Sequence, residues 1–223
     1  IEEKVSIGFT SAGNPKTWTS TLKKEGIIVV HVVSSSKFAQ KAEEAGCDAI
    51  VAEGFEAGGH NGREETTTLV LIPLVRNTIK IPVIAAGGIA TGRQMFASMV
   101  LGASGVQVGS RFVASNEASA HLNFKEKIIG LGEGDTMLSL KQLTPVRLIK
   151  NSFFEEIKKA EENCASIEEL KTILGRARAK KGMFEGDLEN GELEIGQVSA
   201  QINQILPVKQ IVSNLISEYQ SAR

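Results

Sequence analysis

The sequence contains only two cysteines in 223 residues, Cys47 and Cys164, and they are too far apart to form a CxxC motif. We therefore expect neither a zinc site nor a disulfide framework, and we predict a reducing, cytoplasmic location. Lys plus Arg (25) and Asp plus Glu (26) nearly cancel, which leaves a formal net charge of -1. Without a basic surplus to neutralise phosphates, no nucleic-acid partner is expected.

Long apolar runs are also missing, and none approaches the roughly 20 residues that a membrane-spanning helix needs, so no membrane partner is expected. GxGxxG is absent after the apolar runs and no Walker lysine follows them, which argues against Rossmann and P-loop nucleotide sites. What is present is the balance of an ordinary globular chain, with 42% hydrophobic and 23% charged residues. This composition is sufficient for a sizeable apolar core.

The first half alternates short β-branched runs with segments of helical character. The predicted strands are Val5–Phe9, Ile27–Val33, Asp48–Ala52, Pro82–Ala86 and Gly105–Val108. The predicted helices between them are Lys16–Glu25, Ser36–Ala45, Thr67–Thr78 and Thr91–Leu101. Because the runs are apolar on both faces and a helix separates each pair, they predict an α/β fold with a buried parallel sheet.

Beyond Arg111 the pattern changes and the strand signal stops. Helices are predicted over Glu117–Ile129, Val146–Glu162 and Ser166–Leu174, and two more over Gln197–Gln220, broken near Pro207. Ser166 with Glu169 forms a capping-box pattern, and Gly175–Gly196 is a charged, glycine-rich connection. We therefore predict that residues 1–115 form the strand-containing domain and that residues 116–223 form a helical cap without strands.

Glycines gather just past the ends of the predicted strands. They are Gly13, then Gly54, Gly58, Gly59 and Gly62, then Gly87 and Gly88, and finally Gly109. In parallel α/β proteins the carboxyl ends of the strands form the functional edge, where glycine lets the backbone approach a ligand. The glycine-rich ends of the last two strands also present backbone N–H groups suited to a phosphate.

The densest segment is Glu53–Thr68, which follows a strand directly and precedes a helix that Thr66 is placed to cap. Within it, glycines flank His60, so packing gives little reason for a histidine here. Imidazole gains and loses protons near neutral pH, which suits acid–base chemistry. The alternative is a surface histidine in a flexible turn. His31, inside a strand, and His121, at a helix start, are interpreted as structural.

Three segments carry a resemblance to a known family: EGFEAGGHNGREETTT (Glu53–Thr68), IPVIAAGGIATG (Ile81–Gly92) and GVQVGSRFVAS (Gly105–Ser115). The similarity extends from FTSAGNP (Phe9–Pro15) to FEGDLENGELEIGQVSA (Phe184–Ala200). These segments resemble the nitronate monooxygenase (2-nitropropane dioxygenase-like) family, which includes the flavin-dependent enoyl-acyl-carrier-protein reductase II.

The resemblance implies a TIM-type (β/α)8 barrel that binds FMN at the carboxyl ends of its strands. In that alignment the predicted strands are the fourth to eighth of the barrel, and about three earlier strands are absent from this chain. Position by position, His60 matches the active-site histidine. The cofactor-binding positions that it implies are Ser11, Ala12, Gly13, Ala57, Gly58, Gly59, Gly87, Gly88, Gln107, Gly109, Ser110 and Gln197.

The first function that the resemblance implies is reduction of an enoyl thioester by NADH or NADPH through FMN, with a small-molecule or acyl-carrier-protein-linked substrate. The alternative is a nitronate monooxygenase that oxidises nitronates with O₂. A third reading, from another class, is a non-catalytic half-barrel that binds a phosphate ligand or a partner chain. The basic run Arg176–Lys181 would suit an acidic carrier protein or the NADPH phosphate, although such runs are more often solvated. Formation of a homodimer is a further possibility.

Overall fold

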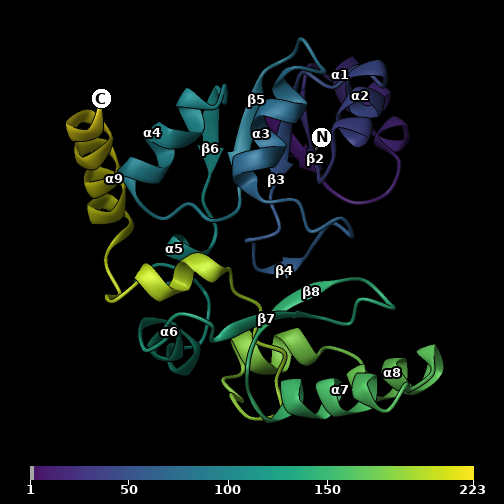
Figure 1. The fold of residues 1–223 in the computed structure, drawn as a ribbon. Coiled ribbons are helices and arrows are strands. Elements are labelled where there is room, and N and C mark those ends of the chain that lie inside the picture. Colours follow the sequence, from purple (N-terminus) through teal and green to yellow (C-terminus); the bar gives the residue numbers. More distant parts are fainter. Residues whose placement is uncertain (1–2) are drawn as a thin grey trace.

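The computed structural model describes residues 3–223 and places two β-sheets in separate halves of the molecule (Figure 1). The larger sheet has five parallel strands in the order β1-β2-β3-β5-β6. Its strands are β1 (Ile7–Thr10), β2 (Ile28–Val33), β3 (Ala49–Glu53), β5 (Val83–Ala86) and β6 (Gly105–Gln107). All five predicted strands are confirmed, and no strand end differs from the prediction by more than two residues.

Helices separate these strands as the alternating pattern predicts. They are the 3₁₀ turn η1 (Pro15–Thr17), α1 (Thr19–Lys24), α2 (Ser36–Glu44), α3 (Thr68–Arg76) and α4 (Gly92–Val100). Gly26, Gly46 and Gly102 follow three of them with φ of 73°, 87° and 104°, the left-handed conformation that ends a helix at low cost for glycine. The parallel α/β fold predicted from the sequence is therefore confirmed.

The core of this half lies between the sheet and its helices. Ile50 and Val83 of the sheet are fully buried against Ile72 and Val75 of α3. At roughly 1.5–3 kcal/mol for each large apolar side chain, this burial stabilises the sheet that carries the glycine-rich turns. The strands form an open sheet within residues 3–223, with β1 at one edge and β6 at the other.

The second half contains strands that the sequence analysis did not predict. A three-stranded antiparallel sheet has the order β4-β8-β7. Its strands are β4 (Gly59–His60), β7 (Thr136–Ser139) and β8 (Val146–Ile149). The remaining helical elements are α5 (Ser110–Val113), α6 (Leu122–Ile129), α7 (Ser152–Glu162), α8 (Ile167–Leu174), the π-helical turn η2 (Lys180–Phe184), the 3₁₀ turn η3 (Gln197–Gln201) and α9 (Val208–Ala222). Of these, α7 packs against β7. The prediction of a strand-free cap was therefore wrong.

The error has a physical reason. All four residues of β8, Val-Arg-Leu-Ile, are buried, and a run this short has no periodicity that distinguishes a strand from the start of a helix. The helix begins only at Ser152, where the side chain of Asn151 accepts a hydrogen bond from the backbone N–H of Phe154 at 2.9 Å. The predicted helix Val146–Glu162 is thus a strand followed by α7.

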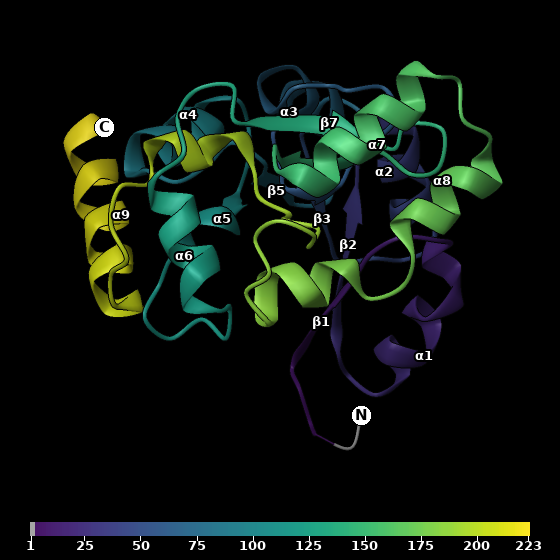
Figure 2. The ribbon, with the colours of Figure 1, turned by 90° about the horizontal axis from the view of Figure 1, so that it is seen from below.

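The helices after α7 agree better with the sequence. Ser166 and Glu169 form both bonds of a capping box at the start of α8, as predicted. After Pro207 the chain forms α9, which runs beside α4 (Figures 1 and 2). There Glu218 accepts a hydrogen bond from the backbone N–H of Gly92 at 2.8 Å. None of the helices formed by residues 3–223 has the length and apolar character needed to cross a membrane.

Candidate functional site

The loop after β3 is held by its own acidic side chain. The carboxylate of Glu56 accepts the backbone N–H of Thr68 at 2.9–3.0 Å and thereby caps α3. The N-cap residue of α3 is Thr67, and its side chain makes no capping hydrogen bond. The prediction that Thr66 caps this helix was therefore wrong. The hydroxyl of Thr68 lies 2.9 Å from the carbonyl oxygen of Gly87, which ties the loop to the end of β5.

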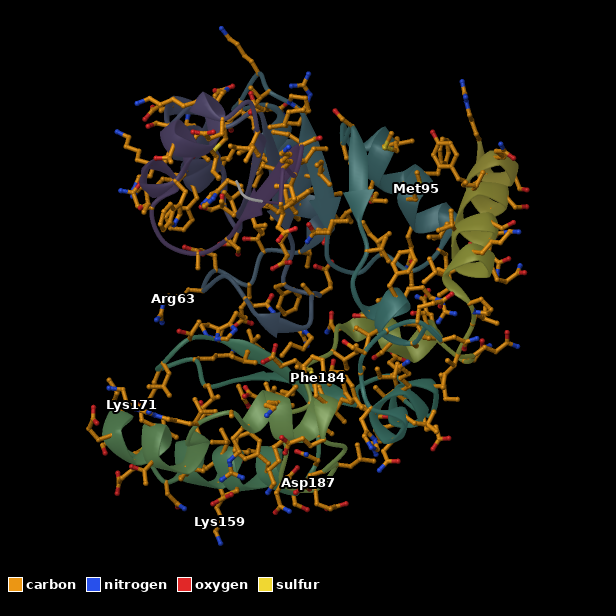
Figure 3. The ribbon with its side chains drawn as sticks, turned by 180° about the vertical axis from the view of Figure 1, so that it is seen from behind. Arg63, Met95, Lys159, Lys171, Phe184 and Asp187 are labelled. Carbon is orange, nitrogen blue, oxygen red and sulfur yellow. The ribbon has the colours of Figure 1, made fainter. Side chains whose placement is uncertain are left out.

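A buried arginine from the second sheet anchors the same loop. Arg147 in β8 is 2% exposed, and its guanidinium donates to the carbonyl of Phe55 at 2.8 and 3.1 Å. The guanidinium also lies over the Phe55 ring, 4.8 Å from its centroid. Farther along the loop, the exposed Arg63 donates to the carbonyls of Lys141 and Leu143 at 3.0 and 2.7 Å, between the two halves (Figure 3).

His60 lies in the short strand β4 and not in a free turn. Its backbone is opposite Val146 of β8, so the second sheet fixes its position while its side chain stays exposed. Asn61 supports the preceding turn because its amide donates to the carbonyls of Ala57 and Gly59 at 2.9 and 3.0 Å. The structure thus gives the glycine-flanked histidine a defined place beside the parallel sheet.

Two cavities lie at the carboxyl ends of the parallel strands. The smaller, of about 190 Å³, includes seven predicted cofactor positions: Ala57, Gly58, Gly87, Gly88, Gln107, Gly109 and Ser110. Gly87 and Gly88 have φ of 91° and 70°, and a Cβ built on Gly109 would have no atom within 4 Å. Glycine here therefore leaves space above two neighbouring strand ends, as an approaching phosphate requires.

The larger cavity, of about 760 Å³, is lined by predicted site residues that are not part of the smaller one. His60 and the Ser11–Gly13 turn line it, together with His31. His31 lies 2.7 Å from the hydroxyl of Thr10, and burial lowers its pKa, so it is neutral near pH 7. This volume is within the roughly 300–1,000 Å³ of small-molecule pockets.

Two predicted positions lie beside these cavities without lining them. Gln197 donates its backbone N–H to the carbonyl of Glu56 at 2.9 Å and so packs next to the loop. Gly59 is buried, and a Cβ built on it would lie 2.4 Å from a carboxyl oxygen of Glu194. The requirement for glycine at this position comes from that close approach.

Sequence analysis missed three acids near the site, of which Glu192 is buried and Glu53 and Glu194 are half-buried. Glu53, the last residue of β3, lines both cavities, and burial raises its pKa to about 7. Glu194 lines the smaller cavity, and burial raises its pKa while the charge of His60 acts in the opposite direction. Glu192 has a pKa of about 7, raised by burial and then by the charge of Glu194. An acid that directly follows an apolar run, as Glu53 does, is the signal that could have identified one of them.

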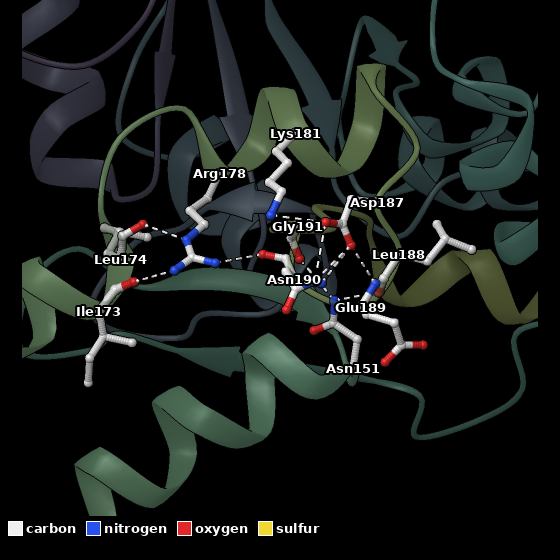
Figure 4. Close-up of polar contacts among 10 residues, drawn as sticks. All are labelled: Asn151, Ile173, Leu174, Arg178, Lys181, Asp187, Leu188, Glu189, Asn190 and Gly191. Atoms are coloured by element: carbon white, nitrogen blue, oxygen red, sulfur yellow. Dashed lines mark hydrogen bonds and ion pairs between the residues drawn. The ribbon is translucent and has the colours of Figure 1, made fainter.

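A network of polar contacts holds the connection that carries Glu192 and Glu194 (Figure 4). Arg178 donates to the carbonyl of Asn190 at 2.9 Å, and Asn151 donates to the carbonyl of Gly191 at 2.9 Å. Asp187 accepts hydrogen bonds from Asn190 and Lys181, which lower its pKa. The same bonds hold the turn that precedes Glu192 and Glu194. The two glutamates are thus presented to the site by a rigid segment.

The fold and site define a parallel α/β protein with a glycine-rich, strand-end cavity next to a histidine-lined one. The profile of the nitronate monooxygenase family matches residues 2–218, and the chain belongs to that family. A probable nitronate monooxygenase of Staphylococcus aureus is 36% identical over 231 residues, which cover 98% of this chain and 64% of the relative. One of Bacillus subtilis is 32% identical over 96% of this chain and 63% of its own length.

Solved structures show the same fold. FabK from Thermotoga maritima superposes with a TM-score of 0.93 at 42% identity, over 99% of this chain and 70% of that chain. Nitroalkane oxidase from Streptomyces ansochromogenes gives a TM-score of 0.81 at 27% identity, over 100% of this chain and 66% of that chain. The present chain therefore spans slightly less than two thirds of the length of the curated relatives it matches.

Proposed function

We propose that the protein containing this chain is an FMN-dependent oxidoreductase that reduces enoyl thioesters with NADH or NADPH. The observation that carries the proposal is the arrangement of two adjoining cavities at one sheet edge. The smaller is lined by glycine-rich strand ends, the larger by His60, and both by Glu53. The similarity to FabK favours this activity over other reactions of the family.

The smaller cavity fits the phosphate of FMN. Gly87, Gly88, Gly109 and Ser110 would hold it, because open space remains where a Cβ on Gly109 would project. Burial raises the pKa of Glu53 to about 7, so this acid carries less negative charge at neutral pH and repels an anionic ligand less. When bound, FMN would supply the two-electron chemistry that amino-acid side chains lack.

The residues of this chain would bind and orient the substrate in the larger cavity. His60 is exposed to that cavity on a strand fixed by β8, so its imidazole is placed to polarise a thioester carbonyl or to move a proton. Ser11–Gly13 would form the opposite wall. An acyl-carrier-protein-linked substrate and a cytoplasmic location belong to this proposal.

The second candidate is a nitronate monooxygenase, favoured by the names of the curated relatives. In that reaction His60 would stabilise the nitronate anion or take a proton from a neutral nitroalkane. A homodimer is compatible with either activity.

The test uses the full-length protein. A flavin spectrum after purification is expected, followed by NAD(P)H oxidation that depends on a crotonyl or longer enoyl thioester. Oxygen uptake with a nitronate and no enoyl-dependent oxidation would favour the second candidate. A colourless protein without either activity would overturn both and leave a non-catalytic binding role.

A further inference from the structure

Glu53 is a half-buried acid that takes no part in the chemistry of the proposed function. It ends β3 and lines both the smaller and the larger cavity, which adjoin there. Desolvation alone accounts for its pKa shift, and among residues 3–223 no hydrogen bond or charged neighbour offsets that cost. An acid that is desolvated without compensation costs free energy, and at functional sites such a cost is often tied to chemistry.

We propose that Glu53 is a second catalytic residue of this site, which hands a proton to the substrate atom that gains negative charge during turnover. This inference rests on the proposed function and assigns it a proton donor. The position of Glu53 favours a ligand that gains electron density during the reaction, such as a thioester that becomes an enolate. A neutral acid donates to such an anion, whereas an ionised one would repel it.

The step balances in atoms and electrons. NAD(P)H is the two-electron reductant of the proposed function, and addition of hydride at the β-carbon breaks the C=C π bond. The electron pair moves to the α-carbon and the thioester oxygen. The O–H bond of Glu53 then breaks as a C–H bond forms at the α-carbon, which leaves Glu53 as a carboxylate. Water in the larger cavity returns the proton.

The neighbours of Glu53 suit this role. From the larger cavity it is faced by two histidines, His31 and His60, and from the smaller by Glu194. The charged residues Lys16, Lys41 and Glu44 line the larger cavity as well. None of these groups forms an ion pair with Glu53 within the described residues, so its proton stays available near neutral pH.

Glu161 provides a control away from the site. It is a half-buried glutamate of α7 whose pKa is also raised by burial, and it lines neither of the two cavities that Glu53 joins. Comparing Glu53→Gln with Glu161→Gln therefore separates the effect of position from the effect of desolvation. Glutamine keeps the size of the side chain and removes the transferable proton.

In the full-length protein, Glu53→Gln should retain flavin and lower enoyl-thioester turnover by roughly 10²-fold or more, the range for a lost acid–base group. The fall in wild-type turnover as pH rises through about 7 should disappear, since the acid must be protonated to act. Glu161→Gln should keep both the rate within about twofold and the pH profile.

Infrared difference spectroscopy gives a readout independent of turnover. The carbonyl bands of protonated carboxylic acids at neutral pH should lose one component in Glu53→Gln, and in the wild type that component should shift when an enoyl thioester binds. Glu192 and Glu194, whose pKa values are also raised, account for components that remain. If Glu53→Gln does not fold, displacement of the same component in Glu53→Asp decides the question. Wild-type-like turnover of a folded Glu53→Gln, or absence of that component, would overturn the proposal. A wild type without enoyl reduction would instead refute the proposed function.

Discussion

Replacing Arg147 with methionine tests how the second sheet supports the site. Arg147 is 2% exposed and donates twice to the carbonyl of Phe55, over whose ring it lies. A hydrogen bond from a charged group contributes about 1.5–3 kcal/mol, and a desolvated cation–π contact up to about 2. Burial lowers the pKa of Arg147, so its charge is costly, and methionine removes that cost. We expect Arg147→Met to lower the free energy of unfolding by about 2 kcal/mol.

Arg63→Met is the matched control. Arg63 also donates to two backbone carbonyls, those of Lys141 and Leu143, but it does so at the exposed surface. Water replaces such bonds readily, so the expected loss is below about 0.5 kcal/mol. The measurement is urea unfolding of the full-length protein. With a slope of about 2 kcal/mol per molar, Arg147→Met should lower the midpoint by about 1 M.

Equal midpoints for the two variants would refute the reasoning, because burial would then not distinguish them. Arg147→Met should also reduce flavin content, since Phe55 belongs to the loop that leads to Ala57 and Gly58. A stable variant with full flavin content would show that the loop does not depend on this anchor.

Four further predictions concern single positions. Gly109→Asp should abolish FMN retention with a nearly unchanged melting temperature, because the carboxylate projects into open space and repels a phosphate. Gly92→Ala should instead destabilise by about 1–3 kcal/mol in thermal unfolding, since its Cβ would lie 2.2 Å from the carbonyl oxygen of Leu215. His60→Ala should keep flavin and stability but lose turnover by about 10²-fold. His121→Ala, which removes a helix cap, should lower the melting temperature and leave turnover per folded molecule unchanged. Results opposite to these in flavin content, melting temperature or turnover would contradict each assignment.

The parallel sheet could be predicted because short stretches of sequence specify each of its strands and the helices between them. The run at Ile50–Ala52 is apolar on both faces, and Gly46 ends the preceding helix, so a short window specifies both elements. The predicted cofactor positions at Gly87 and Gly109 follow from the same rule, since parallel strands end on one edge.

The second sheet could not be predicted in this way. Its strand β4 has only two residues, Gly59 and His60, and exists because β8 lies 86 positions later in the chain at Val146. A pairing of this kind leaves no periodic signal in either segment. Likewise, Arg147 and Phe55 are 92 positions apart, and nothing in either segment alone indicates the contact.

The same distinction applies to the chemistry of the site. His60 was identifiable because its neighbours in the sequence are glycines, which give a histidine no packing role. Glu53 has neighbours typical of any strand end, and what sets it apart is that no partner compensates its burial while two cavities adjoin at its carboxyl. Desolvation is a property of the folded environment, so the proton that this acid holds near neutral pH arises only from tertiary structure. A site that pairs a sequence-visible histidine with a fold-dependent acid therefore has one group placed to polarise a carbonyl and another that can give up a proton.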